Sequence, residues 1–393
     1  MAVGLYISGL EHATDNETVE KYAARYVKEL EDATFDYLYY TKIEKIYYYN
    51  EQSSLVIKIF EHPKGSEKSD SDKLVYKLYD FEYSKELNQN YQSKNLLFKN
   101  VSLLLLVLRR FPKIFVNLFK KSTFQKGGKT IYMFFLFLIM SLAVLSLLPL
   151  LIMTFDNTFN FDSYNNMNPK NGLALVIKYG ILLTITFILF MPESNIILTK
   201  IAAEFITLEN YIYNNKQKEN IRGHLNKLIA YIVQHEANEK IHFHTYSFGS
   251  IIALDSLFPI NSKPNMNIQN RVNLLITIGA PYEFIQNYYP DFYKNRSEIM
   301  TKKTQWINVY SLLDAFASNF RYDNKAGEAN YGIVNKKEIP ININYETNHN
   351  VFDFLALKQI YMHESYWDDS KSGQSCTRLI FFKMKEIGQW SAA

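Results

Sequence analysis

The chain has almost no cysteine, since Cys376 is the only one among 393 residues. A single thiol excludes an intramolecular disulfide framework and favours a reducing compartment. No Cys/His cluster has the ligand spacing of a zinc site. The stretch Gly127-Gly-Lys129-Thr130 lacks the upstream glycine of a phosphate-binding P-loop. We therefore expect neither a metal nor another cofactor.

Charged residues are absent from residues 131–155, a run of 25 residues that as a helix would be about 37 Å long. A second apolar run covers residues 173–198, and Lys178 is the only charge before position 192. Uncharged runs of this length are typical of membrane spans and rare in soluble cores. We predict a two-helix transmembrane hairpin. The alternative is a buried pair of core helices.

Acidic residues are absent from residues 96–130, which carry eight Lys or Arg side chains. This basic segment precedes the first predicted span, where cations meet anionic lipid head groups, so we expect a membrane surface and no nucleic acid as the partner. Within it, residues 96–119 are apolar but interrupted by charges, which favours an interfacial segment over a core helix. Between the spans Lys170 is the only cation. The positive-inside rule then places both ends of the hairpin in the cytoplasm.

The hydrophobic fraction of 48% and the aromatic fraction of 16% exclude a disordered chain. Residues 2–9 lack the basic region of a signal peptide and are expected to form a strand. A helix is expected through residues 19–30, capped by Asp15 or Asn16. Further strands are expected at 36–49, 54–60, 74–83, 241–246, 272–278 and 306–312, and further helices at 219–236 and from 249 onward. Alternating strands and helices predict an α/β fold with a mostly parallel sheet and helices on both faces.

The predicted strand at 241–246 leads into Thr245-Tyr-Ser247-Phe-Gly249 and then into a helix. This fits the pattern small-x-Ser-x-Gly, in which small flanking residues allow a tight strand-to-helix turn that presents the serine hydroxyl. Thr245 replaces the usual first glycine. The alternative interpretation of Ser247 is a turn or N-cap residue without chemistry.

The C-terminal half resembles the α/β-hydrolase superfamily, in particular its lipase and esterase members. The segments that carry the resemblance are HTYSFGSIIALDSL, LLITIGAPY, WINVYSLLDAF and YMHESYW, within residues 217–370. The resemblance implies an α/β-hydrolase-like domain built from residues 1–95 and 201–393, and it leaves residues 96–200 as a membrane insertion. It also implies cleavage of a carboxylic ester through an acyl-enzyme.

The resemblance further implies a catalytic triad of Ser247, Asp314 and His363, in the order serine, acid, histidine. Only His349 and His363 follow Asp314 in the chain. The aromatic Tyr-Trp pair after His363 makes it the better match. The expected oxyanion donors are the backbone N–H of Phe248 and one from the loop after the first strand, at Gly9 or Leu10. Asp255 and Asp291 are the other acids considered, and both are expected to be structural or solvated.

His242 and His244 stand two apart on a predicted strand, so both side chains point to one face. Such a pair could bind a metal, but no third ligand is evident from the spacing. We favour a packed pair of buried side chains.

Together these features predict an integral membrane protein whose catalytic domain faces the cytoplasm and cleaves a lipophilic ester beside the bilayer. An acyltransferase or thioesterase could use the same triad. Alternatives from other classes are a catalytically inactive binding or scaffold protein on a hydrolase fold and a pore-forming effector. The sequence makes no prediction of the oligomeric state.

Overall fold

The fold is taken from a computed structural model. It describes residues 2–10, 18–65, 69, 71–83, 87, 105, 109, 112, 207–301, 303–312, 314, 316–320, 340–345, 363, 365–367 and 375–390. The chain divides into two compact units, one of residues 1–86, 122–126 and 215–393, the other of residues 87–121 and 127–214. Nearly all described residues belong to the first unit. In the second unit, residues 207–213 form a helix.

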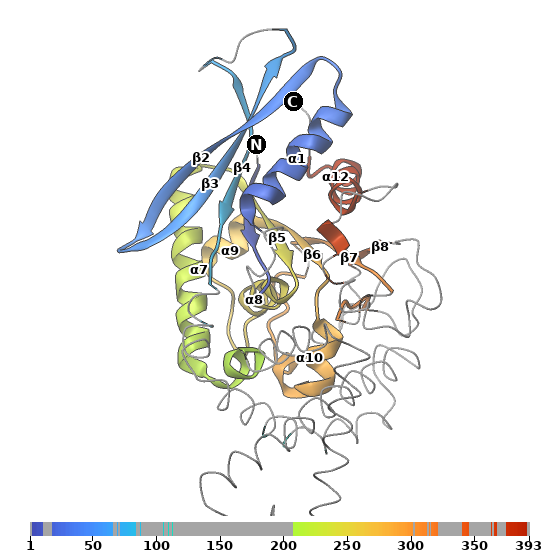
Figure 1. Ribbon diagram of the computed structural model, residues 1–393. Helices are drawn as coiled ribbons and strands as arrows, with labels where there is room; N and C mark the ends of the chain where they lie inside the picture. Colours follow the sequence, from blue (N-terminus) through green and yellow to red (C-terminus); the bar gives the residue numbers. More distant parts are fainter. Residues whose placement is uncertain are drawn as a thin grey trace, which may run out of the picture. The chain divides into compact units, whose positions relative to one another are not determined.

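The first unit contains one eight-stranded sheet in the order β2-β3-β4-β1-β5-β6-β7-β8 (Figure 1). The six strands from β4 to β8 run parallel, whereas β2 and β3 form an antiparallel hairpin at one edge. This confirms the predicted α/β class and the mostly parallel sheet. The strands are β1 Ala2–Ile7, β2 Tyr37–Tyr49, β3 Gln52–Pro63, β4 Lys73–Asp80, β5 Lys240–Tyr246, β6 Val272–Ile278, β7 Gln305–Tyr310 and β8 Ile341–Asn344.

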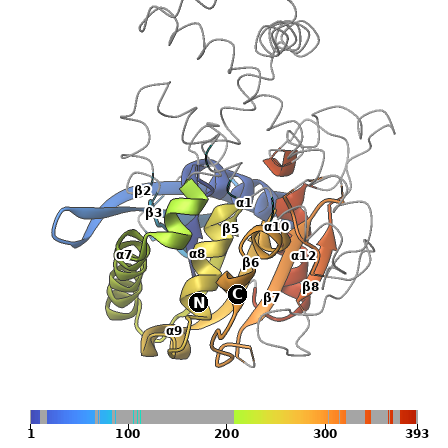
Figure 2. The ribbon, with the colours of Figure 1, turned by 90° about the horizontal axis from the view of Figure 1, so that it is seen from below.

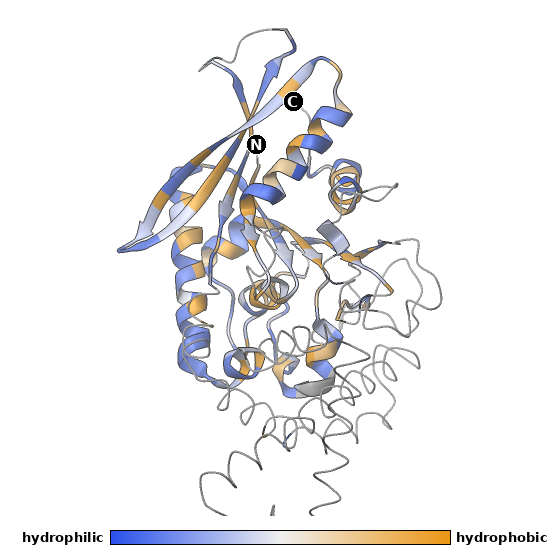
Figure 3. Ribbon diagram, viewed as in Figure 1, coloured by the Kyte–Doolittle hydropathy of each residue, from blue (hydrophilic) through white to orange (hydrophobic). Residues whose placement is uncertain are grey.

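Helices cover both faces of this sheet (Figure 2). The helices α1 and α12 pack on the face to which His244 of β5 points, and α8 packs on the face of Thr245. Figure 3 shows α8 as largely hydrophobic, as expected of a helix that is buried on all sides. The helices are α1 Val19–Ala33, α7 Asn215–His235, α8 Phe248–Leu257, α9 Met266–Arg271, α10 Tyr282–Tyr288 and α12 Cys376–Glu386, with 3-10 turns η1 Pro290–Tyr293 and η3 Ser365–Trp367.

Helix α1 follows the predicted pattern, but its cap differs from the prediction. Thr18 is the N-cap, with its side-chain oxygen accepting from the Lys21 N–H. The prediction of Asp15 or Asn16 was therefore wrong by a few residues, because hydrophobic periodicity locates a helix better than it locates its first turn. The buried face of α7, from Ile221 to Ile232, is the one that the sequence predicted.

A buried layer of tyrosine and histidine side chains lies between β5 and α1. The His244 ring is fully buried, and its two nitrogens lie 3.0 Å from the Tyr22 hydroxyl and 2.9 Å from the Tyr76 hydroxyl. The His242 Nδ1 lies 3.2 Å from the same Tyr76 hydroxyl. Burial lowers the pKa of His242 to about 4, and burial together with the neighbouring His242 lowers the pKa of His244 well below its usual value. Both imidazoles are therefore neutral core groups at neutral pH.

The predicted interfacial segment 96–119 lies outside the described residues except at positions 105, 109 and 112, and the predicted spans 131–155 and 173–198 lie wholly outside them. Within the part of the chain that is described, no helix has the length and apolarity needed to cross a membrane.

Candidate active site

Ser247 occupies the turn between β5 and α8, and its backbone is held in an uncommon conformation. Its φ is 49° and its ψ is −123°, a positive φ that non-glycine residues seldom adopt. The Ser247 N–H donates to the Ile278 carbonyl at 2.8 Å, and the Ser247 carbonyl accepts from the Ser250 N–H at 3.0 Å. These bonds fix the turn to β6 and to α8. A strained, fixed turn of this kind presents a side chain at the end of a strand.

Gly249 and Thr245 are the two small residues of the motif, and a different contact explains the presence of each. At Gly249, a Cβ atom would collide with the backbone carbonyl oxygens of Ile7 and Ser8, so only glycine fits there. At Thr245, where the pattern usually has glycine, the hydroxyl donates to the Ile276 carbonyl at 2.8 Å and lies 2.9 Å from the Ser250 hydroxyl. The buried threonine hydroxyl is therefore hydrogen-bonded, which explains how the site accommodates this departure from the pattern.

The structure brings Ser247, His363 and Asp314 together in a hydrogen-bonded chain. The His363 Nε2 lies 2.7 Å from the Ser247 Oγ, and the His363 Nδ1 lies 2.8 Å from the Asp314 Oδ2. Asp314 is fully buried and His363 nearly so, while Ser247 is partly exposed. With Nδ1 protonated, the imidazole donates to the carboxylate and accepts the serine proton on Nε2. This is the arrangement that a nucleophile, a base and an orienting acid require.

The Asp314 carboxylate is hydrogen-bonded on both oxygens. Oδ1 accepts from the Phe316 N–H at 2.9 Å, and Oδ2 accepts from the Tyr366 hydroxyl at 3.0 Å as well as facing His363. Burial and the nearby Asp314 charge raise the pKa of Tyr366 well above its ordinary value, so its hydroxyl stays protonated and remains a donor. The Tyr366 oxygen in turn accepts from the Ser311 N–H at 2.8 Å. These bonds offset the desolvation of the buried carboxylate.

Aromatic side chains hold the His363 ring in place. The Tyr246 ring stacks on it at 5.3 Å, the Phe316 ring meets it edge-on at 5.4 Å, and the Tyr246 hydroxyl donates to the His363 carbonyl at 2.6 Å. Gly279, with φ of +60°, leaves space for the imidazole, since a Cβ there would lie 3.0 Å from the His363 Cε1. The sequence prediction missed Tyr246 and Tyr366 as supporting residues, although both lie inside the segments that carry the resemblance.

The loop after β1 lies against the start of α8, where the predicted oxyanion donors are. Gly249 is in close contact with Ile7 and Ser8, and the Tyr83 hydroxyl donates to the Ser8 carbonyl at 2.9 Å. Leu10 is buried in the same loop, and Phe248 is the first residue of α8. Backbone N–H groups at a helix N-terminus face outward without an intrahelical partner. The assignment of Phe248 and Leu10 as oxyanion donors stays a prediction.

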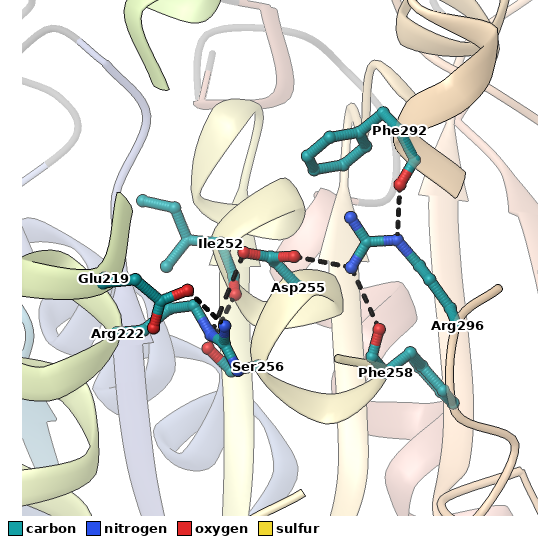
Figure 4. A network of polar contacts seen from close by, with 8 residues as sticks. All are labelled: Glu219, Arg222, Ile252, Asp255, Ser256, Phe258, Phe292 and Arg296. Carbon is teal, nitrogen blue, oxygen red and sulfur yellow. Dashed lines mark hydrogen bonds and ion pairs between the residues drawn. The ribbon is translucent and has the colours of Figure 1, made fainter. Parts of the chain in front are cut away.

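A buried ion pair between Asp255 of α8 and Arg296 holds this helix in place (Figure 4). The Arg296 Nη1 lies 2.5 Å from the Asp255 Oδ1 and donates to the Phe258 carbonyl at 2.9 Å, while its Nε donates to the Phe292 carbonyl at 2.8 Å. Asp255 is thus engaged in structure, whereas Asp291 forms an exposed ion pair with a neighbouring lysine. His349 lies outside the described residues.

The described residues contain no group of three or more His, Cys, Asp or Glu side chains placed to hold a metal ion. His242 and His244 instead contact tyrosine hydroxyls, as described above.

Comparison with known proteins finds no matching family model, no similar curated protein and no similar solved structure.

Proposed function

We propose that the chain is a serine hydrolase of the α/β-hydrolase type, with Ser247 as nucleophile, His363 as general base and Asp314 as the orienting acid. The observation that carries this proposal is the hydrogen-bonded chain from the Ser247 Oγ through the His363 ring to the Asp314 carboxylate. Two further features support it: the strained turn at Ser247, and the order of the three residues along the chain.

The proposed reaction begins when the Ser247 Oγ attacks an ester carbonyl carbon and its proton moves to the His363 Nε2. The carbonyl oxygen becomes an oxyanion, which backbone N–H groups at the start of α8 would stabilise. The bond to the leaving alcohol then breaks, and the alcohol takes the proton from His363. Water, deprotonated by the same imidazole, then attacks the acyl carbon. The bond from that carbon to the Ser247 Oγ breaks, the imidazole returns its proton to Oγ, and the carboxylic acid leaves. Throughout, Asp314 holds the Nδ1–H and stabilises the imidazolium.

The proposed substrate is an ester with a lipophilic acyl chain. This part of the proposal is supported by the sequence, in which the two apolar runs and their basic flank would hold a cytoplasmic catalytic domain at the bilayer surface. A lipophilic ester partitions into that bilayer and would reach the site from there. The proposed protein is therefore anchored in the membrane that contains its substrate.

The test is hydrolysis of p-nitrophenyl esters of increasing acyl length by the full-length chain in detergent micelles. We expect wild type to prefer long acyl chains and Ser247→Ala to lower kcat by roughly 10⁴-fold or more. Ser256→Ala is the matched control, because Ser256 lies on α8, the helix that follows Ser247, and its hydroxyl donates to the Ile252 carbonyl one turn earlier. Activity that survives Ser247→Ala, or no activity with any ester, would contradict the proposal.

A further inference from the structure

The two edges of the sheet differ greatly in length. At one edge, β8 has four residues, Ile341–Asn344, whereas at the other edge β2 has thirteen, Tyr37–Tyr49. Among the described strands, β2 has β3 as its only neighbour, so its outer row of backbone N–H and C=O groups faces away from the sheet (Figure 1). Near the start of the strand, the Tyr39 N–H donates to the Glu31 Oε1 of α1 at 3.2 Å, so the middle of β2 is the part considered for pairing. Natural proteins usually shorten or cover such an edge, since it can pair with another strand.

The middle of β2 has exposed side chains on both faces of the strand. Every residue from Thr41 to Lys45 is exposed, and Ile43 at the centre is 58% exposed. Tyr47, further along the strand, is 62% exposed. β-branched and aromatic side chains are the ones that stabilise cross-strand pairs, and aromatic residues are enriched in protein interfaces. An exposed strand of this composition is suited to pairing with another strand.

We propose that β2 pairs in antiparallel fashion with β2 of a second copy of this chain, about a two-fold axis at Ile43, and so joins two sheets into one. In this register Ile43 lies opposite its own counterpart. Lys42 lies opposite Glu44 of the second copy, and Thr41 lies opposite Lys45. The pairing is isologous, so the Lys42–Glu44 pair and the Thr41–Lys45 pair each occur twice.

The charges of β2 select this register over its neighbours. A two-fold pairing centred on Lys42 would place the two Lys42 side chains opposite each other, and one centred on Glu44 would do the same with the two carboxylates. Only the pairing centred on Ile43 places opposite charges together, and like charges directly opposite are destabilising. Glu44 already forms an ion pair with Lys58 of β3 at 2.5 Å, so in the dimer it would lie between two lysines.

The same charges favour a second copy over a lipid surface. Glu44 is exposed beside Lys42 and Lys45, and a carboxylate at this position would face anionic head groups unfavourably. Self-pairing instead gives the Glu44 carboxylate a second cationic partner, besides Lys58. None of these residues belongs to the proposed active site.

Cysteine cross-linking tests the register in the full-length chain. The native Cys376 is fully buried, so a cysteine placed on β2 is the accessible thiol. Opposite residues in an antiparallel pair have Cα atoms about 4.5 to 5.5 Å apart, within the range of a disulfide. We expect Ile43→Cys to form a covalent dimer under mild oxidation. Lys45→Cys is the matched control: its counterpart would be displaced by about 13 Å along the strand, so it should not cross-link.

Charge reversal tests the same pairing without cysteine. Lys42→Glu alone, or Glu44→Lys alone, should raise the dimer dissociation constant by roughly tenfold or more, because each creates two like-charged pairs. The double variant should restore the wild-type value, as measured by sedimentation in detergent. Ester hydrolysis should be unchanged in all three variants.

Several results would overturn the proposed dimer. These are a monomer at every concentration, equal cross-linking of the two cysteine variants, and a dimer that is insensitive to the single charge reversals. A monomer whose binding to phosphatidylserine vesicles is lost with Lys42→Glu would identify the strand as a lipid contact instead.

Discussion

Two histidines within the same fold, His363 and His244, lie in opposite surroundings. The His363 ring bridges a buried carboxylate and a partly exposed hydroxyl, at 2.8 Å and 2.7 Å. The His244 ring lies only three residues before Ser247, yet its nitrogens face the Tyr22 and Tyr76 hydroxyls inside the core. Neither tyrosine supplies a negative charge, because burial raises the pKa of both well above the ordinary value.

The difference teaches that the partner of an imidazole, more than its burial, decides whether it can act as a base. In the proposed reaction Asp314 would stabilise a protonated His363, so that this ring could accept the Ser247 proton. Among the described residues, His244 contacts no carboxylate, and burial lowers its pKa well below the usual range. A proton on that ring would be an uncompensated charge in the core. His363 is therefore suited to chemistry and His244 to packing.

Replacing each of the two histidines separately should test the difference between them most clearly. We expect His363→Ala to lower ester hydrolysis by roughly 10⁴-fold to 10⁶-fold, with little change in the unfolding midpoint. His244→Leu should instead destabilise the fold by about 1 to 3 kcal/mol, because two buried tyrosine hydroxyls lose their hydrogen bonds to the imidazole. Its hydrolysis per folded molecule should stay at the wild-type level. Urea unfolding and initial rates on the same preparations measure both effects, and the reverse outcome would invalidate the assignment.

The Asp314 carboxylate provides a second test of the difference between the His363 and His244 sites. Asp314→Asn keeps the shape of the side chain but removes the charge that distinguishes the His363 site from the His244 site. We expect kcat to fall by roughly 10⁴-fold, since the imidazolium loses its stabilising partner and the ring its tautomer. Asp291→Asn is the control, because Asp291 is exposed and forms an ion pair with Lys294 at the surface. Equal rates for the two variants would show that Asp314 has no part in the reaction.

A third test of the comparison is pH, which acts on stability through the core histidines and leaves the proposed reaction aside. Burial lowers the pKa of His242 from 6.5 to about 4, so the unfolded chain binds this proton at higher pH than the folded chain does. The contribution to stability is full above pH 6.5 and is lost as the pH falls toward 4, by about 3 kcal/mol. We expect His242→Phe to flatten the unfolding free energy over this window relative to wild type. An unchanged pH slope would mean that His242 does not titrate as its burial implies.

Local patterns were sufficient to predict the strands and helices around the site. Residues 241–246 and the helix after them were expected from periodicity, and the turn at Ser247 follows from the small residues at Thr245 and Gly249. The sequence could also rank His363 above His349 by its aromatic neighbours. These features depend on residues close together in the chain, which single-sequence reasoning can evaluate.

Features that depend on distant residues were not predicted. The strand β8 is only four residues long, and its pairing with β7 gives no local signal. Helix α12 and the Tyr366 hydroxyl, which binds Asp314 from 52 residues away, were also missed. The pairing partner of a polar group is fixed by packing, so no spacing rule reveals it.

The central claim is that Ser247 is a nucleophile activated by His363, and labelling with a fluorophosphonate probe tests it most directly. The probe reacts only with an activated serine, and mass spectrometry of the digested full-length chain locates the adduct. The account predicts one adduct on the peptide that contains Ser247, at wild-type level in Ser256→Ala and absent in both Ser247→Ala and His363→Ala. An adduct on any other residue, or undiminished labelling of Ser247→Ala, would contradict it.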